Sequence, residues 1–127
     1  MSKLEKAKLE SLQKIAKLKH IDDSKKHFLI CTGPKCFDTE AGDRVWKKIK
    51  AYLKEHNLDQ GNVFRTRAKC LRICSEGPIG VVYPEAKWFC QLNEENIEPF
   101  LQSYFLEGHT DHPLEFCENK AFQQKTP

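Results

Sequence analysis

Long apolar runs are absent from this sequence, and so are the usual targeting segments. No apolar stretch approaches the roughly 18 residues that a membrane-spanning helix needs. The N-terminus lacks the apolar core of a secretory signal, and it is Lys-rich without Arg, which argues against a mitochondrial presequence. We therefore expect a cytoplasmic protein with no membrane span.

The motifs of several enzyme classes are also missing. The chain has no GxGxxG or P-loop nucleotide motif, no nucleophile elbow, and no internal repeat. Its five histidines flank the expected elements or lie outside the expected core. Since no catalytic constellation is visible, we do not expect an enzyme.

The composition is that of a soluble globular protein, with 39% hydrophobic and 31% charged residues in a chain of 127. The net charge of +3 is unevenly distributed. Residues 1–27 hold eight lysines against four acidic residues, whereas residues 28–127 hold thirteen basic against fourteen acidic residues. The basic character belongs to the leader and not to the body, and we expect no nucleic-acid partner.

The leader, residues 1–25, predicts a Lys-rich amphipathic helix and a linker. Apolar residues recur at helical spacing among the lysines of residues 3–19, and the stripe consists of Leu4, Leu9, Leu12, Ile15 and Leu18. We expect this helix to dock on the body. The alternatives are a contact helix for an acidic partner or an anionic surface, and disorder.

The body, residues 26–108, alternates between strand and helix patterns. We expect helices at 40–55 and 93–106, and strands at 27–30, 62–68, 80–83 and 87–92. The first crossover favours a parallel strand pair, and the turn at Pro84-Glu85 makes the last two strands antiparallel. The order β-α-β-β-β-α predicts an α/β, thioredoxin-like fold with a four-stranded mixed sheet and an extra N-terminal helix.

The residues that follow the body are polar, with a few aromatics. We expect residues 109–127 to be a loosely held C-terminal tail. The strand at 87–92 would then lie at a sheet edge, where it can pair with a second copy of the chain to give a homodimer.

The strand at 62–68 has two faces of different character. Its alternation places Phe64, Thr66 and Ala68 on one face. We expect the basic residues to lie on the outer face of the strand, and they are Arg65, Arg67 and Lys69.

Four of the six cysteines follow the first two strands of the body. Cys31 and Cys36 flank the loop after the first strand, and Cys70 and Cys74 lie in the loop after the second. Loops after the carboxyl ends of neighbouring parallel strands lie side by side, so the two pairs should converge. Four thiolates suit zinc or an iron–sulfur cluster.

The segment CTGPKC also resembles the C-G-P-C of thiol–disulfide enzymes, although its two cysteines are further apart.

The residues around these cysteines resemble a known family, the thioredoxin-like [2Fe–2S] ferredoxins. The small iron–sulfur subunit of NADH dehydrogenase complexes is similar. The similarity covers about residues 26–108, and the segments that carry it are Cys31–Cys36 after a strand, Cys70-Leu-Arg-Ile-Cys74, Gly77-Pro-Ile-Gly-Val-Val-Tyr-Pro84 and Lys87-Trp-Phe.

The resemblance implies that one [2Fe–2S] cluster is bound by Cys31, Cys36, Cys70 and Cys74. It implies a one-electron carrier that shuttles electrons between redox protein partners by transient docking. A cluster-bearing interaction or sensor subunit of a larger redox complex is the alternative, and a thiol–disulfide oxidoreductase is a further one.

Several further residues have expected roles other than binding iron. Cations favour the more negative, reduced cluster, and those beside the cysteines are Lys35, Lys69 and Arg72. Cys90 is expected to be a packed small hydrophobe, and Cys117 a free thiol in the tail. Gly77-Pro78 is the candidate for the cis-proline that thioredoxin-like folds place before the corresponding strand, although X-Pro bonds are mostly trans.

Overall fold

A computed structural model describes residues 5–34 and 37–123 of the chain. Lys35 and the predicted ligand Cys36 lie outside the described residues.

The body contains a five-stranded mixed sheet with the strand order β2-β1-β3-β4-β5. β1 and β2 are parallel, and the other neighbouring pairs are antiparallel. The strands are β1 (Lys26–Cys31), β2 (Val63–Ala68), β3 (Ile79–Tyr83), β4 (Lys87–Phe89) and β5 (Glu115–Glu118). The four predicted strands and their directions are therefore correct, but β4 ends at Phe89 where the sequence indicated a strand as far as residue 92, and the sheet has one strand more than the sequence indicated.

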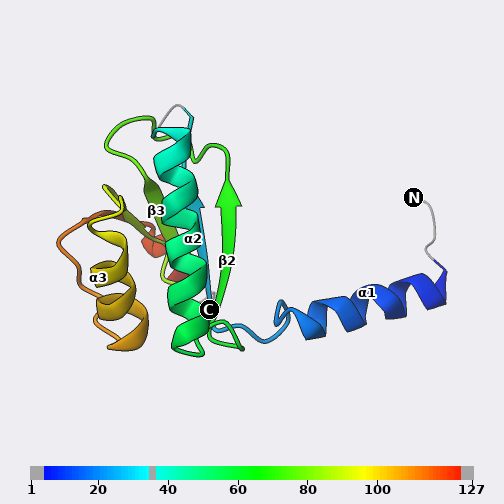
Figure 1. The fold of residues 1–127 in the computed structure, drawn as a ribbon. Coiled ribbons are helices and arrows are strands. Elements are labelled where there is room, and N and C mark those ends of the chain that lie inside the picture. Colours follow the sequence, from blue (N-terminus) through cyan, green and yellow to red (C-terminus); the bar gives the residue numbers. More distant parts are fainter. Residues whose placement is uncertain (1–4, 35–36, 124–127) are drawn as a thin grey trace.

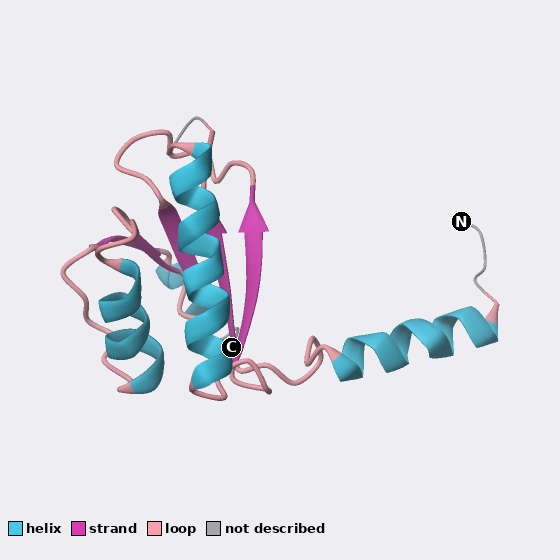
Figure 2. Ribbon diagram, viewed as in Figure 1, coloured by secondary structure: helices cyan, strands magenta, loops and turns pink. Residues whose placement is uncertain are grey.

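Helices α2 (Thr39–Glu55) and α3 (Ile97–Leu101) cover the same face of the sheet (Figures 1 and 2). α2 begins after Asp38, whose carboxylate accepts the Ala41 N–H at 3.0 Å, as expected of an N-cap. α3 continues into a π-helical segment, η1 (Gln102–Leu106). The predicted helix at 93–106 is thus present, although its first residues form a turn in which Asn93 Oδ1 accepts the Glu95 and Asn96 N–H groups.

The core lies between the sheet and these helices. α2 contributes Val45, Ile49 and Leu53, which are all fully buried. The strands and α3 fill the remainder mainly with aromatic and aliphatic side chains, among them Phe28, Ile30, Phe89, Phe100 and Tyr104. None of the residues of this core cluster comes from the leader.

The arginines of β2 lie on the helix-covered face, which corrects their predicted outward placement. The Arg65 guanidinium lies 4.3 Å from the centre of the Trp46 ring on α2, and Arg67 pairs with Asp43 on the same helix. The apolar set of the strand faces the other way, where Phe64 packs edge-on against His27. The predicted alternation is right, but the two faces were assigned the wrong way round.

The C-terminal segment is held more firmly than the sequence indicated. β5 pairs with β4, and a 3-10 helix, η2 (Lys120–Gln123), follows it. The largely buried Lys87 ammonium donates to the Thr110 carbonyl at 2.8 Å and lies 3.4 Å from the Glu115 carboxylate. The prediction of a loose tail is therefore wrong for the described part, and β4 does not form the free edge on which the homodimer hypothesis depended.

The N-terminal helix α1 (Lys6–Leu18) forms as predicted but does not dock on the body. It projects away from the sheet and the other helices (Figure 1). The structure describes all thirteen of its residues and none is buried, and its exposed apolar stripe comprises Leu9, Leu12, Ile15 and Leu18. Within the described ranges, no helix is both long enough and apolar enough to cross a membrane.

Candidate metal centre

The ends of β1 and β2 bring two of the predicted ligand segments side by side. Cys31, the last residue of β1, is aligned with Ala68, the last residue of β2. The Cys31 thiol is 2% exposed and donates to the carbonyl oxygen of Lys69 at 3.3 Å. The first predicted ligand thus contacts the residue immediately before Cys70.

The second cysteine loop is exposed and contains a hydrogen bond to sulfur. Cys70 and Cys74 are both exposed free thiols. The backbone N–H of Arg72 donates to Cys70 Sγ at 3.2 Å. Arg72 adopts a left-handed conformation with φ of 71°, which residues other than glycine rarely adopt. An N–H group aimed at a ligand sulfur stabilises negative charge on that sulfur.

The first cysteine loop is tight at Gly33-Pro34. Gly33 has φ of 112°, and a Cβ at this position would lie 2.2 Å from the Phe37 carbonyl oxygen. Both the Gly33-Pro34 and Gly77-Pro78 bonds are cis, and the second confirms the predicted cis-proline. The Tyr83-Pro84 bond is cis as well.

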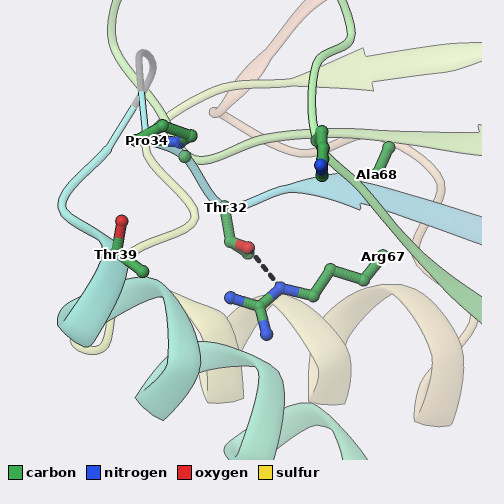
Figure 3. Close-up of a pocket in the computed structure, with 7 residues that line it drawn as sticks. Thr32, Pro34, Thr39, Arg67 and Ala68 are labelled. Carbon is green, nitrogen blue, oxygen red and sulfur yellow. Dashed lines mark hydrogen bonds between the residues drawn. The ribbon is translucent and has the colours of Figure 1, made fainter.

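A polar contact links the first loop to β2 and α2. Arg67 Nε donates to the Thr32 hydroxyl at 2.6 Å, and its guanidinium contacts the Asp43 carboxylate at 2.5 Å. Figure 3 shows the hydrogen bond between Arg67 and Thr32. Both residues line a cavity of about 400 Å³. Gly42 permits the approach of α2, since a Cβ there would lie 2.3 Å from the Thr32 carbonyl oxygen.

Sequence reasoning missed this arrangement of Thr32, Arg67 and Asp43. Arg67 was expected to face solvent, and no spacing rule connects these three positions, which are far apart in the chain. The only local indication was the place of Thr32 directly after Cys31.

A complete metal site is not assembled in the part of the chain that the structure describes. Across residues 5–34 and 37–123, no group of three or more His, Cys, Asp or Glu side chains is placed to hold a metal ion. Cys36 lies outside these ranges. The donor chemistry nevertheless fits a four-thiolate centre, because soft sulfur ligands lie on two segments that the β1–β2 pairing holds together.

The remaining two cysteines lie elsewhere on the sheet. Cys90, just after β4, is half-buried, and its Sγ lies 3.5 Å from the Leu114 carbonyl oxygen. Cys117 is exposed on β5 opposite Trp88. These placements agree with the packed thiol and the free thiol predicted for them.

The fold is that of the thioredoxin-like proteins. It has the mixed sheet, the helices that cover one of its faces (Figure 1), and the expected strand directions. Two solved structures of a thioredoxin-like [2Fe–2S] ferredoxin from Aquifex aeolicus are similar to it. One has a TM-score of 0.64 and 20% sequence identity, and covers 74% of this chain and 92% of its own. The wild-type protein at 1.5 Å resolution has a TM-score of 0.61 and 21% identity, and covers 72% of this chain and 96% of its own.

Sequence similarity points to the same group of proteins. A putative 2Fe-2S ferredoxin of Priestia megaterium is 29% identical over 89 residues, which are 70% of this chain and 68% of the relative. A 2Fe-2S ferredoxin of Clostridium pasteurianum is 28% identical over 92 residues, with 66% and 88% of the two chains covered. No protein-family model matches the chain. The resemblance to the thioredoxin-like [2Fe–2S] ferredoxins is thereby confirmed.

Proposed function

We propose that the protein is a one-electron carrier that holds one [2Fe–2S] cluster through Cys31, Cys36, Cys70 and Cys74. The observation that carries this proposal is the contact between the Cys31 thiol and the Lys69 carbonyl, which joins the two cysteine segments at the ends of β1 and β2. The similarity to two 2Fe-2S ferredoxins supports the identity of the cluster.

When bound, the cluster supplies a centre that accepts and returns one electron. The chain's own residues do the rest. Cys31 is a buried ligand at the end of β1, whereas Cys70 and Cys74 are exposed and leave one side open to a partner. The Arg72 N–H stabilises charge on Cys70 Sγ, and the neighbouring Lys69 and Arg72 side chains are cations that favour the reduced state.

The partners we propose are redox proteins that dock transiently, and the chain carries out no substrate chemistry of its own. The lysines of the leader and the cations beside Cys70 favour an acidic contact surface on the partner. Binding to the reductase should therefore weaken as ionic strength rises, since salt screens exposed charges beyond about 8–10 Å. The proposed location is the cytoplasm.

The decisive measurement is the visible absorption and electron paramagnetic resonance of anaerobically purified protein, before and after dithionite, together with iron and acid-labile sulfide analysis. We expect a coloured protein with two irons and two sulfides per chain, and a resonance that appears on reduction by one electron. A colourless protein that contains zinc, or no metal, contradicts the proposal.

A further inference from the structure

We propose that Arg67 is a positioning residue of the cluster site, which fixes the Cys31 segment to the Cys70 segment through the hydroxyl of Thr32. This inference rests on the proposed function and assigns a task to a residue that binds no iron. It also makes Arg67 a fixed positive charge close to the cluster.

The geometry joins the two ligand segments on both faces of the sheet. On the helix-covered face, Arg67 Nε donates to the hydroxyl of Thr32, the residue directly after Cys31. On the opposite face, the Cys31 thiol donates to the Lys69 carbonyl. The Cys31 thiol loses its proton when it binds iron, so its hydrogen bond to Lys69 belongs to the metal-free chain. The hydrogen bond from Arg67 to Thr32 is the one that remains to hold the two loops at the separation that a cluster requires.

The burial of Thr32 makes the hydrogen bond from Arg67 difficult for water to replace. Thr32 is 2% exposed, whereas the Arg67 side chain is 33% exposed. Loss of the Arg67 donor would leave the buried Thr32 hydroxyl without this charged hydrogen-bond donor, which would destabilise the loop. The hydrogen bond therefore restrains the first turn of the loop that follows Cys31.

The planar guanidinium suits this position in a way that an ammonium group does not. One edge of Arg67 donates to Thr32 on the first loop, and another nitrogen contacts Asp43 on α2. The fork thus links β2, α2 and the first cysteine loop at the same time. A lysine would keep the charge, but all its N–H donors lie on one nitrogen and do not form a planar fork.

Arg65 provides a matched comparison on the same strand. It lies two residues before Arg67 on the same face of β2 and carries the same charge. Unlike Arg67, it stacks on Trp46, and it lies two residues further along the strand from Cys70. Neutralising Arg65 therefore removes an equivalent charge from β2 without removing the contact to Thr32.

The test uses the cluster-loaded full-length protein and the variants R67Q, R67K, T32V, T32S and R65Q. Two quantities are measured: the rate at which an iron chelator removes the cluster, and the midpoint potential. We expect R67Q and T32V to lose iron about tenfold faster than wild type, and T32S and R65Q to stay within about twofold of wild type.

The potential separates the effect of charge from the effect of position. R67Q should lower the ratio of reduced to oxidised cluster about threefold at a fixed applied potential. T32V should leave this ratio unchanged, because it removes no charge. R67K should keep the ratio of the wild type but lose iron as quickly as T32V.

The inference is overturned if R67Q and T32V lose iron no faster than R65Q. Where R67Q does not fold, T32V and T32S decide the question, because T32V removes the hydroxyl acceptor and T32S keeps it, and neither changes the arginine. A wild-type protein without iron would contradict the proposed function instead, and this result is visible before any variant is made.

Discussion

The backbone of Arg72 is held in a left-handed conformation, and its N–H points at the sulfur of Cys70 across 3.2 Å. A non-glycine residue with φ of 71° carries backbone strain, of order 1 kcal/mol. Strain of this kind persists where the surrounding structure requires the conformation. Here it places a donor beside an exposed ligand of the proposed cluster.

Substitution of Arg72 by glycine or by alanine separates this strain from the charge of the side chain. Both variants lose the cation and keep the N–H, but glycine adopts positive φ without steric conflict. We expect R72G to be about 1 kcal/mol more stable towards urea than R72A, with equal midpoint potentials for the two. Equal stabilities would show that the Arg72 conformation is not strained.

Serine substitution of the cysteines tests the ligand assignment. C31S, C36S, C70S and C74S should each lower the iron content or alter the visible spectrum, because serine oxygen is a harder ligand than thiolate. The controls C90S and C117S should keep the spectrum of the wild type. Loss of the cluster in C90S with retention in C74S would contradict the assignment.

Replacement of Gly42 by alanine should loosen the packing of α2 on the first cysteine loop. The added Cβ would lie 2.3 Å from the Thr32 carbonyl oxygen, so the helix must move away from the loop. The clash should lower the free energy of unfolding by about 1–3 kcal/mol, although alanine has the higher helix propensity. Iron loss to a chelator should also become faster. K47A, at an exposed position of the same helix, should change stability by about 0.5 kcal/mol or less.

His112 should make stability fall on mild acidification. Burial against the aromatic core lowers the pKa of His112 below its ordinary value of 6.5. The unfolded state therefore binds a proton more readily, so this part of the stability is present above about pH 6.5 and is lost as pH falls through the lowered pKa. Protonation also removes the acceptor of the Leu114 N–H.

The measurement is the free energy of urea unfolding of wild type and H112Q at about pH 7.5 and pH 5.5. The pKa of His27 is lowered by burial in the same direction, so both proteins should lose stability on acidification. The wild type should lose more than H112Q. Identical losses would assign the pH dependence to other groups.

Removal of residues 1–19, which include α1, should leave the body intact. Because no residue of α1 is buried, a chain that begins at residue 20 should unfold at the temperature of the full-length protein, to within about 2 °C. The truncated protein should also show a weaker dependence of partner binding on ionic strength, since most of the leader's lysines are lost. A large drop in melting temperature would mean that α1 packs against the body in solution.

Local patterns predicted the elements whose formation depends on local residues. The helical pattern within residues 40–55 predicted α2, and the cysteine spacing after two parallel strands predicted which segments meet. β5 was missed because Glu115–Glu118 has no alternating apolar pattern. Its place depends instead on backbone pairing with β4 and on the distant lysine Lys87.

The faces of β2 were misassigned for a related reason. Apolar residues were expected to face inward, but the helix-covered face carries arginines whose charges are matched by partners on α2. Trp46 offers an aromatic ring to Arg65, and Asp43 offers a carboxylate to Arg67. Such pairs form only in the folded chain, so periodicity within one strand does not reveal them.

The isolation of α1 has a thermodynamic consequence for any complex in which it takes part. A helix of thirteen residues without tertiary contacts is only marginally stable in water. Its population in the free chain is therefore incomplete, and association must supply the free energy of ordering it. A contact of this kind dissociates readily, which suits the transient docking proposed for this protein.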